Sequence, residues 1–392
     1  MHSDILNPEI QRFIDANVGK DISRLALQKN PFPEVEWIAI LNQIASKSKA
    51  KDKLPTWFST SNILYPVKIS MEQASSEKTA QYKATLVSGN QLIDLTGGFG
   101  VDDYYFSKRM KEVIHCEINP DLSSLAAHNF EQLKASNIQC VTGDSTQLLT
   151  NSETNFDWIY IDPSRRNDAK GKVFMLRDCL PNVPELLGIY LKKAPNILIK
   201  TAPILDISAG LTELEHVANI HIVAVDNEVK ELLWEIKKGH SGDITIRTVN
   251  LIKDDQEQFE FIYQQYSVAA FSLPRRYLYE PNSAIMKSGG FDEVSRQFNL
   301  EKLHPHSHLY TSDNLVAFPG RIFEIQKNMP YQKTEMKAFL ENKKANITVR
   351  NFPDTVEKIR KKWKINDGGN QYCFFTTDVN NNKIVLICSK IK

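Results

Sequence analysis

The strongest indication of the fold is the stretch Leu92-Ile-Asp-Leu-Thr-Gly-Gly-Phe-Gly-Val-Asp-Asp-Tyr-Tyr-Phe106. It starts with apolar residues that end at the carboxylate Asp94, continues through a glycine-rich turn and then takes up a helical pattern. Gly98 and Gly100 let a ligand approach the backbone closely, and the start of the following helix offers unpaired N–H groups. The stretch therefore predicts a strand, a ligand-binding turn and a helix. A glycine turn of purely structural role is the alternative, because such turns are common between strands and helices.

Short apolar segments alternate with helical segments from Gln91 to about residue 250. This alternation is typical of βαβ units, which form a parallel sheet. We predict helices over 101–110, 121–133, 146–149 and 183–193. We predict seven strands over 92–95, 113–116, 138–141, 158–161, 197–199, 220–225 and 244–249.

Acidic residues stand where further predicted strands end. Glu117 follows the second strand, where a carboxylate can accept two hydrogen bonds from a ribose diol. Gly143-Asp144-Ser145 follows the third strand, where a carboxylate beside a backbone N–H can bind an adenine amino group, although an Asp here can also be a helix cap. Asp162-Pro163-Ser164-Arg165 follows the fourth strand, and its proline fixes a short rigid turn. Ligands of open α/β sheets bind outside the carboxyl ends of the strands, so these residues predict one shared site.

With these residues the sequence resembles the class I S-adenosylmethionine-dependent methyltransferases over roughly residues 72–250. The resemblance implies an α/β fold with a Rossmann-like, seven-stranded sheet and S-adenosylmethionine as the cofactor. It implies a catalytic loop formed by Asp162, Pro163, Ser164 and Arg165. It also implies that the cofactor is bound by residues of the first three strand ends: Asp94, Thr96, Gly97, Gly98, Gly100, Glu117, Asn119, Asp144 and Ser145.

Two departures from the methyltransferase pattern matter. Thr96 stands where a first glycine is usual, a tolerable change that can add a hydroxyl near the ligand. Ser164 and Arg165 stand where the branch that methylates base amino groups has proline and an aromatic residue. Stacking of a flipped base on that aromatic ring is therefore not assured.

More narrowly, the chain resembles a bacterial methyltransferase family with a THUMP-like C-terminal domain. The resemblance rests on the motifs EQASSEKTAQYKA (72–84), DPSRR (162–166), IKTAPILDIS (199–208) and YEPNSAIMKSG (279–289). It implies the fold and the cofactor more firmly than the substrate. The polar residues of the first motif, which include Ser75 and Lys83, indicate either the solvated face of a linker helix or one wall of the cofactor pocket.

We predict four parts of the chain. Residues 1–70 form a helical cap, with helices over 8–18 and 33–44, and residues 71–270 form the methyltransferase domain, which opens with a helix over 72–86. Residues 271–320 form a loop-rich connection. Residues 321–392 show the order strand, helix, strand, helix, strand, strand, which suits a ferredoxin-like, THUMP-like α/β domain.

The charge of the chain is unevenly distributed. Residues 321–392 contain 15 Lys and Arg against 7 Asp and Glu, whereas the remaining residues contain 33 against 40. A polyanionic partner of this C-terminal part is therefore expected, and RNA is the partner we expect. Candidate substrate-binding residues are Arg166 and Lys200 near the catalytic loop, and Lys361 and Lys362 beside Trp363 in the C-terminal part. A run of charges on a helix is otherwise only a solvated face.

Other features point to a cytoplasmic protein without a metal. The chain has no apolar run long enough to span a bilayer and no signal-like start, and its five scattered cysteines suggest neither disulfides nor a zinc site. His304, His306 and His308 alternate, but we find no matching acid or cysteine cluster and expect a loop with exposed histidines.

The sequence thus predicts a methyltransferase that acts on RNA, with Asp162 as the group that accepts a hydrogen bond or a proton from the nucleophile. A catalytically silent protein that binds S-adenosylmethionine and RNA is the first alternative. Methylation of a protein or a small molecule is the second. A nicotinamide-dependent oxidoreductase is disfavoured, because the turn does not have the GxGxxG spacing.

Overall fold

The computed structural model describes residues 4–165, 175–253 and 255–392, and for Arg165 it describes the backbone only. The chain divides into two compact units. Unit 1 comprises Met1–Ala218 and Leu232–Gly242, and unit 2 comprises Asn219–Glu231 and Asp243–Lys392. Two of the three boundaries fall inside the strands β8 (Val217–Val225) and β9 (Glu228–Lys237), and the third follows Gly242. Each unit is described by itself.

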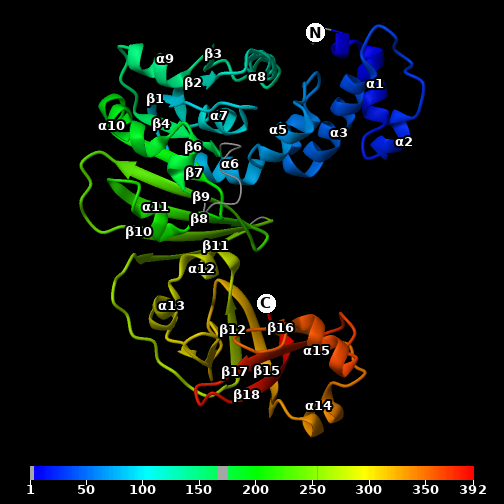
Figure 1. Ribbon diagram of the computed structural model, residues 1–392, viewed down its shortest axis with the longest axis vertical. Coiled ribbons are helices and arrows are strands. Elements are labelled where there is room, and N and C mark those ends of the chain that lie inside the picture. The colour runs from blue at the N-terminus through cyan, green and yellow to red at the C-terminus, as the bar shows by residue number, and fades with distance from the viewer. Residues whose placement is uncertain (1–3, 166–174, 254) are drawn as a thin grey trace. The chain divides into compact units, whose positions relative to one another are not determined.

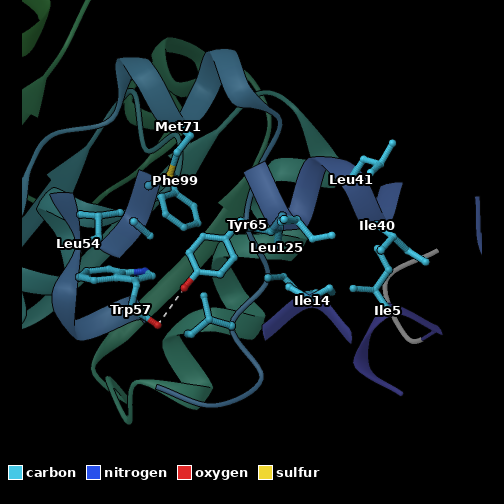
Figure 2. Close-up of a cluster of buried hydrophobic side chains, with 14 of the residues drawn as sticks. Ile5, Ile14, Ile40, Leu41, Leu54, Trp57, Tyr65, Met71, Phe99 and Leu125 are labelled. Atoms are coloured by element: carbon cyan, nitrogen blue, oxygen red, sulfur yellow. Dashed lines mark hydrogen bonds between the residues drawn. The ribbon is translucent and has the colours of Figure 1, made fainter. Parts of the chain in front are cut away.

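The N-terminal helices of unit 1 share a hydrophobic core with the glycine turn (Figure 2). Trp57 is fully buried, and the Tyr65 hydroxyl donates to its carbonyl oxygen at 3.1 Å. Phe99, inside the turn, belongs to the same cluster. The predicted helical cap therefore supports the turn directly. The helices before the sheet are η1 (Asp4–Leu6), α1 (Pro8–Ala16), α2 (Ile22–Ala26), α3 (Trp37–Lys53) and α4 (Pro55–Ser59) of the predicted cap, followed by α5 (Lys68–Gln73) and α6 (Glu77–Ala84).

The sheet of unit 1 has the order β3-β2-β1-β4-β7-β9 (Figure 1). Its neighbouring strands are parallel except β9, which is antiparallel to β7. The chain winds outward from β1 in one direction and from β4 in the other, so the carboxyl ends of β1 and β4 form the topological switch point where doubly wound sheets bind ligands. The other strands of this sheet are β1 (Gly89–Asp94), β2 (Met110–Glu117), β3 (Ile138–Thr142), β4 (Trp158–Ile161) and β7 (Asn196–Thr201).

Helices connect these strands as the sequence predicts, with small corrections. The predicted helix over 101–110 is shorter, because residue 110 already begins β2. The predicted helix over 72–86 is two helices, since the Ser76 hydroxyl accepts the Thr79 N–H and starts α6 as its N-cap. The connecting elements are α7 (Val101–Phe106), α8 (Pro120–Gln132), α9 (Ser145–Asn151), β5 (Ser164–Arg165), η3 (Leu176–Asp178), β6 (Cys179–Leu180), α10 (Val183–Lys193) and α11 (Ile207–Leu211).

The seventh predicted strand has a different place. Residues 244–249 lie in β10 (Thr245–Ile252), which pairs with β8 and with β11 (Asp255–Ile262) in unit 2. The strand beside β7 is β9, which the sequence analysis missed. Glu, Lys and Leu dominate β9, and these residues favour helices over strands.

Unit 2 also contains a seven-stranded sheet of order β13-β14-β12-β15-β18-β17-β16. The prediction of a loop-rich connection was wrong, because the stretch 274–319 supplies three strands of this sheet and two helices: β12 (Tyr277–Pro281), α12 (Ser283–Ser288), α13 (Phe291–Phe298), β13 (Glu301–Lys302) and β14 (Tyr310–Ser312). The order of elements predicted for the C-terminal part is confirmed: β15 (Gly320–Pro330), α14 (Lys333–Phe339), β16 (Asn346–Val349), α15 (Val356–Trp363), β17 (Gln371–Thr377) and β18 (Lys383–Lys390). β15 pairs with β12 on one side and with β18 on the other.

Candidate methyl-transfer site

Thr96 links the carboxyl ends of β1 and β4. Its backbone N–H and its hydroxyl bond to the same carboxylate oxygen of Asp94, at 2.7 and 3.0 Å. The same hydroxyl accepts the backbone N–H of Asp162 at 2.7 Å. The residue that departs from the expected glycine therefore joins the glycine turn to the predicted catalytic loop, which a glycine could not do.

Glu117 joins the glycine turn to the end of β2. One carboxylate oxygen accepts the Gly98 N–H at 2.9 Å, and the other accepts the Asn119 N–H at 2.8 Å. The side chain is only partly buried, so its remaining lone pairs are available as hydrogen-bond acceptors. Ile118, the next residue, is 73% exposed and was not singled out from the sequence. An exposed aliphatic side chain directly after an acidic strand end was the available signal.

The three glycines of the turn are needed for different reasons. A Cβ on Gly97 would lie 2.3 Å from the His115 ring, and a Cβ on Gly100 would lie 2.3 Å from the Phe130 ring. Gly98 has a φ of +56°, and a Cβ there would meet only the Thr96 carbonyl oxygen, at an ordinary contact distance of 3.6 Å. Packing therefore requires Gly97 and Gly100, while Gly98 leaves room for a ligand.

Two predicted cofactor residues act as helix caps. The Asn119 side chain accepts the N–H groups of Asp121 and Leu122 at the start of α8. Asp144 Oδ1 accepts the Gln147 N–H at 3.0 Å and caps α9, whose first residue is Ser145. These contacts orient both side chains at the ends of β2 and β3. A cofactor role for these residues remains a prediction.

A buried acid group behind the turn escaped the sequence analysis. Asp103 Oδ2 lies 2.6 Å from His115 Nδ1, and neither side chain is exposed. Burial raises the pKa of Asp103, as does the neighbouring charge of Asp102. Burial and then the charge of Asp103 raise the pKa of Asp94, whereas burial lowers the pKa of His115. Burial thus disfavours the charged forms of all three groups beside the turn.

A chain of opposite charges leads from this region to the catalytic loop. Lys200 Nζ lies 2.5 Å from Asp162 Oδ2, and Lys200 also lowers the pKa of the buried Asp102. Lys83 is fully buried and lies 3.1 Å from Asp102 Oδ1. Asp102 Oδ2 accepts the hydroxyls of Tyr160 and Ser75 at 2.8 and 2.9 Å. The interpretation of the 72–84 motif as a solvated face was therefore wrong for Ser75 and Lys83, and the two acids of the VDDYYF helix were missed.

The predicted catalytic loop forms a two-stranded ribbon, in which Ser164 pairs with Leu180 and Arg165 with Cys179. Pro163 is buried, Ser164 is exposed and Leu180 is 54% exposed. Directly opposed residues of an antiparallel pair point to the same face, so Ser164 and Leu180 share the exposed face. Arg166 lies outside the described residues, as does the side chain of Arg165.

In unit 2, Lys361 and Lys362 are exposed on α15. Trp363 is 6% exposed and donates to the Tyr331 hydroxyl at 3.1 Å, so it is a core residue rather than a stacking surface. The histidine prediction was wrong in part: His304 is buried, His308 stacks on Phe291 at 3.5 Å, and His306 is exposed.

Within the described residues no group of three or more His, Cys, Asp or Glu side chains could hold a metal ion. The same part of the chain contains no helix long and apolar enough to cross a membrane. All five cysteines are free, and four of them are buried.

Comparisons with known proteins agree with this architecture. Family models match a ferredoxin-like domain over residues 277–319 and a THUMP-like domain over residues 320–390. The solved structure of a putative methyltransferase from Porphyromonas gingivalis W83 covers 99% of this chain and 98% of its own, with 30% identity and a TM-score of 0.87.

Two further structures are similar over part of the chain. An rRNA methylase from Streptococcus thermophilus covers 41% of this chain and 93% of its own, with 13% identity and a TM-score of 0.30. M. capricolum TrmK in complex with S-adenosyl-homocysteine covers 41% and 68%, with 17% identity and a TM-score of 0.30. A search of curated proteins found no match.

Proposed function

Because the chain belongs to the class I S-adenosylmethionine-dependent methyltransferase family with a THUMP-like C-terminal domain, we propose that it methylates a nitrogen of rRNA or tRNA. The observation that carries this proposal is the convergence of three adjacent strand ends. The glycine turn after β1 bonds to Glu117 of β2 through Gly98 and to Asp162 after β4 through Thr96. A ligand bound at this switch point lies between a ribose-binding acid and a catalytic acid.

The residues present fit S-adenosylmethionine. Glu117 would accept the ribose hydroxyls with its free lone pairs, and Asp144 would accept the adenine amino group with Oδ2, because Oδ1 caps α9. The exposed Ile118 would pack against the adenine ring. Gly98, which has no side chain and a positive φ, would let the methionine part of the cofactor approach the backbone closely.

When bound, the cofactor supplies a methyl group on a positively charged sulfur. The chain's own task is to place the acceptor nitrogen in line with that methyl group and to take up the proton that the nitrogen loses. Asp162 can both orient the acceptor nitrogen and take up its proton. Lys200 Nζ binds Asp162 Oδ2, so Oδ1 is left to accept a hydrogen bond from the N–H group that is to be methylated. The Thr96 hydroxyl fixes the backbone at Asp162 and hence the direction of its side chain.

RNA is the preferred acceptor for two reasons. THUMP domains proper are RNA-binding modules of tRNA-modifying enzymes, and residues 320–390 match a THUMP-like domain. The excess of basic residues in the C-terminal part supports the same choice. Arg165 and Arg166 would position a phosphodiester near the catalytic loop.

Mass spectrometry of nucleosides in total RNA tests the proposal. A strain that lacks the gene is expected to lose one methylated nucleoside, and a plasmid copy of the gene is expected to restore it. A plasmid copy with Asp162→Asn is expected to leave it missing. An unchanged set of nucleosides would favour the silent binding protein or a protein or small-molecule acceptor.

A further inference from the structure

Glu280, in the YEPNSAIMKSG motif, bonds to two arginines in unit 2. It is 3% exposed and lies at the end of β12. Arg321 Nε donates to Glu280 Oε2 at 2.7 Å, and an Arg350 terminal nitrogen donates to Glu280 Oε1 at 2.9 Å. Each carboxylate oxygen is thus occupied by a different guanidinium group.

This cluster has more positive than negative charge. Two guanidinium groups share one carboxylate, so one positive charge is left over. The Arg321 and Arg350 side chains are 37% and 34% exposed, so their outer edges are accessible. Arg321 contacts Glu280 Oε2 through both Nε and a terminal nitrogen, and its further contact, to the Thr348 hydroxyl, is long at 3.4 Å. Among the described residues the buried Nε–H of Arg350 has no acceptor. The donors therefore exceed the acceptors that the described chain offers.

A neighbouring histidine reports the same positive field. The pKa of His308 is lowered to about 4, first by burial and then by the charges of Lys302, Arg350 and His306. Lys302 is itself paired with Asp292 at 2.8 Å. Lys302 has a carboxylate of its own, whereas Arg350 shares Glu280 with Arg321.

We propose that Arg321 and Arg350 form a binding site for a phosphodiester group of RNA, with Glu280 holding the two guanidinium groups in place. Planar guanidinium groups suit a tetrahedral anion, because they donate two parallel hydrogen bonds and keep their charge at any physiological pH. One phosphodiester neutralises the single excess charge. The inference rests on the proposed function, since it takes RNA as the substrate, and it names a contact other than the lysines of α15.

Two substitutions with opposite effects test the site in the full-length protein, with fluorescently labelled single-stranded RNA as the probe and no S-adenosylmethionine present. Arg350→Met is expected to weaken RNA binding by about tenfold, since it removes a charge-assisted contact while Arg321 still pairs with Glu280. Glu280→Gln is expected to tighten binding severalfold, because it removes the competing carboxylate. Purely structural arginines would give no gain in RNA affinity with Glu280→Gln.

Arg275→Met is the matched control, because it removes the same charge from unit 2 at a guanidinium already bound to Asp313 and Glu301. Arg350→Met is expected to reduce the salt dependence of binding by about 0.7 in log–log slope, and Arg275→Met is not. Equal effects of the two variants would overturn the inference.

Inorganic phosphate distinguishes free phosphate from RNA. If phosphate stabilises the parent but not Arg350→Met, while RNA affinity is the same for both, the site binds free phosphate and the RNA assignment is wrong. These are binding measurements, so they are separable from the proposed activity. If the protein methylates RNA but the parent, Arg350→Met and Glu280→Gln bind RNA with equal affinity, this inference alone is refuted. A protein that shows the expected affinities without methyl transfer refutes the proposed function alone.

Discussion

At the scale of single residues, the Thr96 hydroxyl joins Asp94 of the glycine turn to Asp162 of the proposed catalytic loop. Thr96→Val keeps the shape but leaves the Asp162 N–H without this acceptor. The hydroxyl makes two hydrogen bonds, to Asp94 and to Asp162, and both are lost. We expect methyl transfer to fall by about tenfold to a hundredfold, with S-adenosylmethionine affinity less affected. Thr96→Ser, which keeps the hydroxyl, is expected to retain activity. If both variants lose the same activity in steady-state kinetics, the hydroxyl has no positioning role.

Glu117 is expected to carry much of the cofactor affinity. Its replacement by alanine removes a charged acceptor for the ribose diol, so affinity for S-adenosylmethionine should weaken by about 1 to 3 kcal/mol. Glu112, at the start of the same strand, bonds to Gln91 instead and provides the control. Isothermal titration of both alanine variants checks the difference. Equal affinities would place the ribose elsewhere.

His308 is expected to make stability depend on pH. Its pKa in the folded chain is lowered to about 4, whereas an unperturbed histidine has a value of about 6.5. Between these values the unfolded chain binds a proton that the folded chain does not, so stability falls as the pH decreases through this window. His308→Asn suits the φ of +53° at this position and removes the titration. Between pH 6.5 and 4, the thermal midpoint of the His308→Asn variant should fall less than that of the parent. Parallel curves of midpoint against pH would show that His308 does not cause the dependence.

At the scale of elements, the buried pair Lys83–Asp102 joins α6 to the first turn of α7. Lys83→Met leaves the Asp102 carboxylate without this partner in a buried position, which should cost about 3 to 5 kcal/mol of stability. The double variant Lys83→Met with Asp102→Asn should recover part of this loss, because no buried charge lacks its partner. Chemical denaturation measures the free energy of unfolding of both variants. A double variant less stable than Lys83→Met would contradict the view that the unpaired buried carboxylate causes the loss.

The elements also show which features could be predicted from the sequence. β4 is an unbroken apolar run and is buried along its whole length, so its pattern determined its assignment. β9 was missed because it is rich in Glu, Lys and Leu, a composition that favours helices. The glycine turn and the strand-end acids were predicted because their roles are local. The pairs Lys83–Asp102 and Lys200–Asp162 could not be predicted from the sequence. Each joins residues far apart in the chain, and only the folded backbone brings them together.

At the scale of the whole molecule, the ferredoxin-like and THUMP-like segments share one sheet. A fragment of residues 321–392 would separate β15 from its partner β12 and leave its edge without hydrogen bonds. We expect this fragment to lack a cooperative thermal transition, and a fragment that begins at residue 243 and includes the unit 2 strands β10 to β18 to show one. A cooperative transition in the short fragment, measured by circular dichroism, would make 321–392 an independent domain.

The central claim is that the switch point of unit 1 transfers methyl groups to RNA. The most direct test incubates the purified protein with radiolabelled S-adenosylmethionine and total RNA from a strain that lacks the gene, followed by digestion to nucleosides. The account predicts label in one methylated nucleoside with the parent protein. It predicts none with Asp162→Asn, although that variant still binds S-adenosylmethionine by calorimetry. Label incorporated equally by Asp162→Asn, or no label in RNA from a parent protein that binds the cofactor, would contradict it.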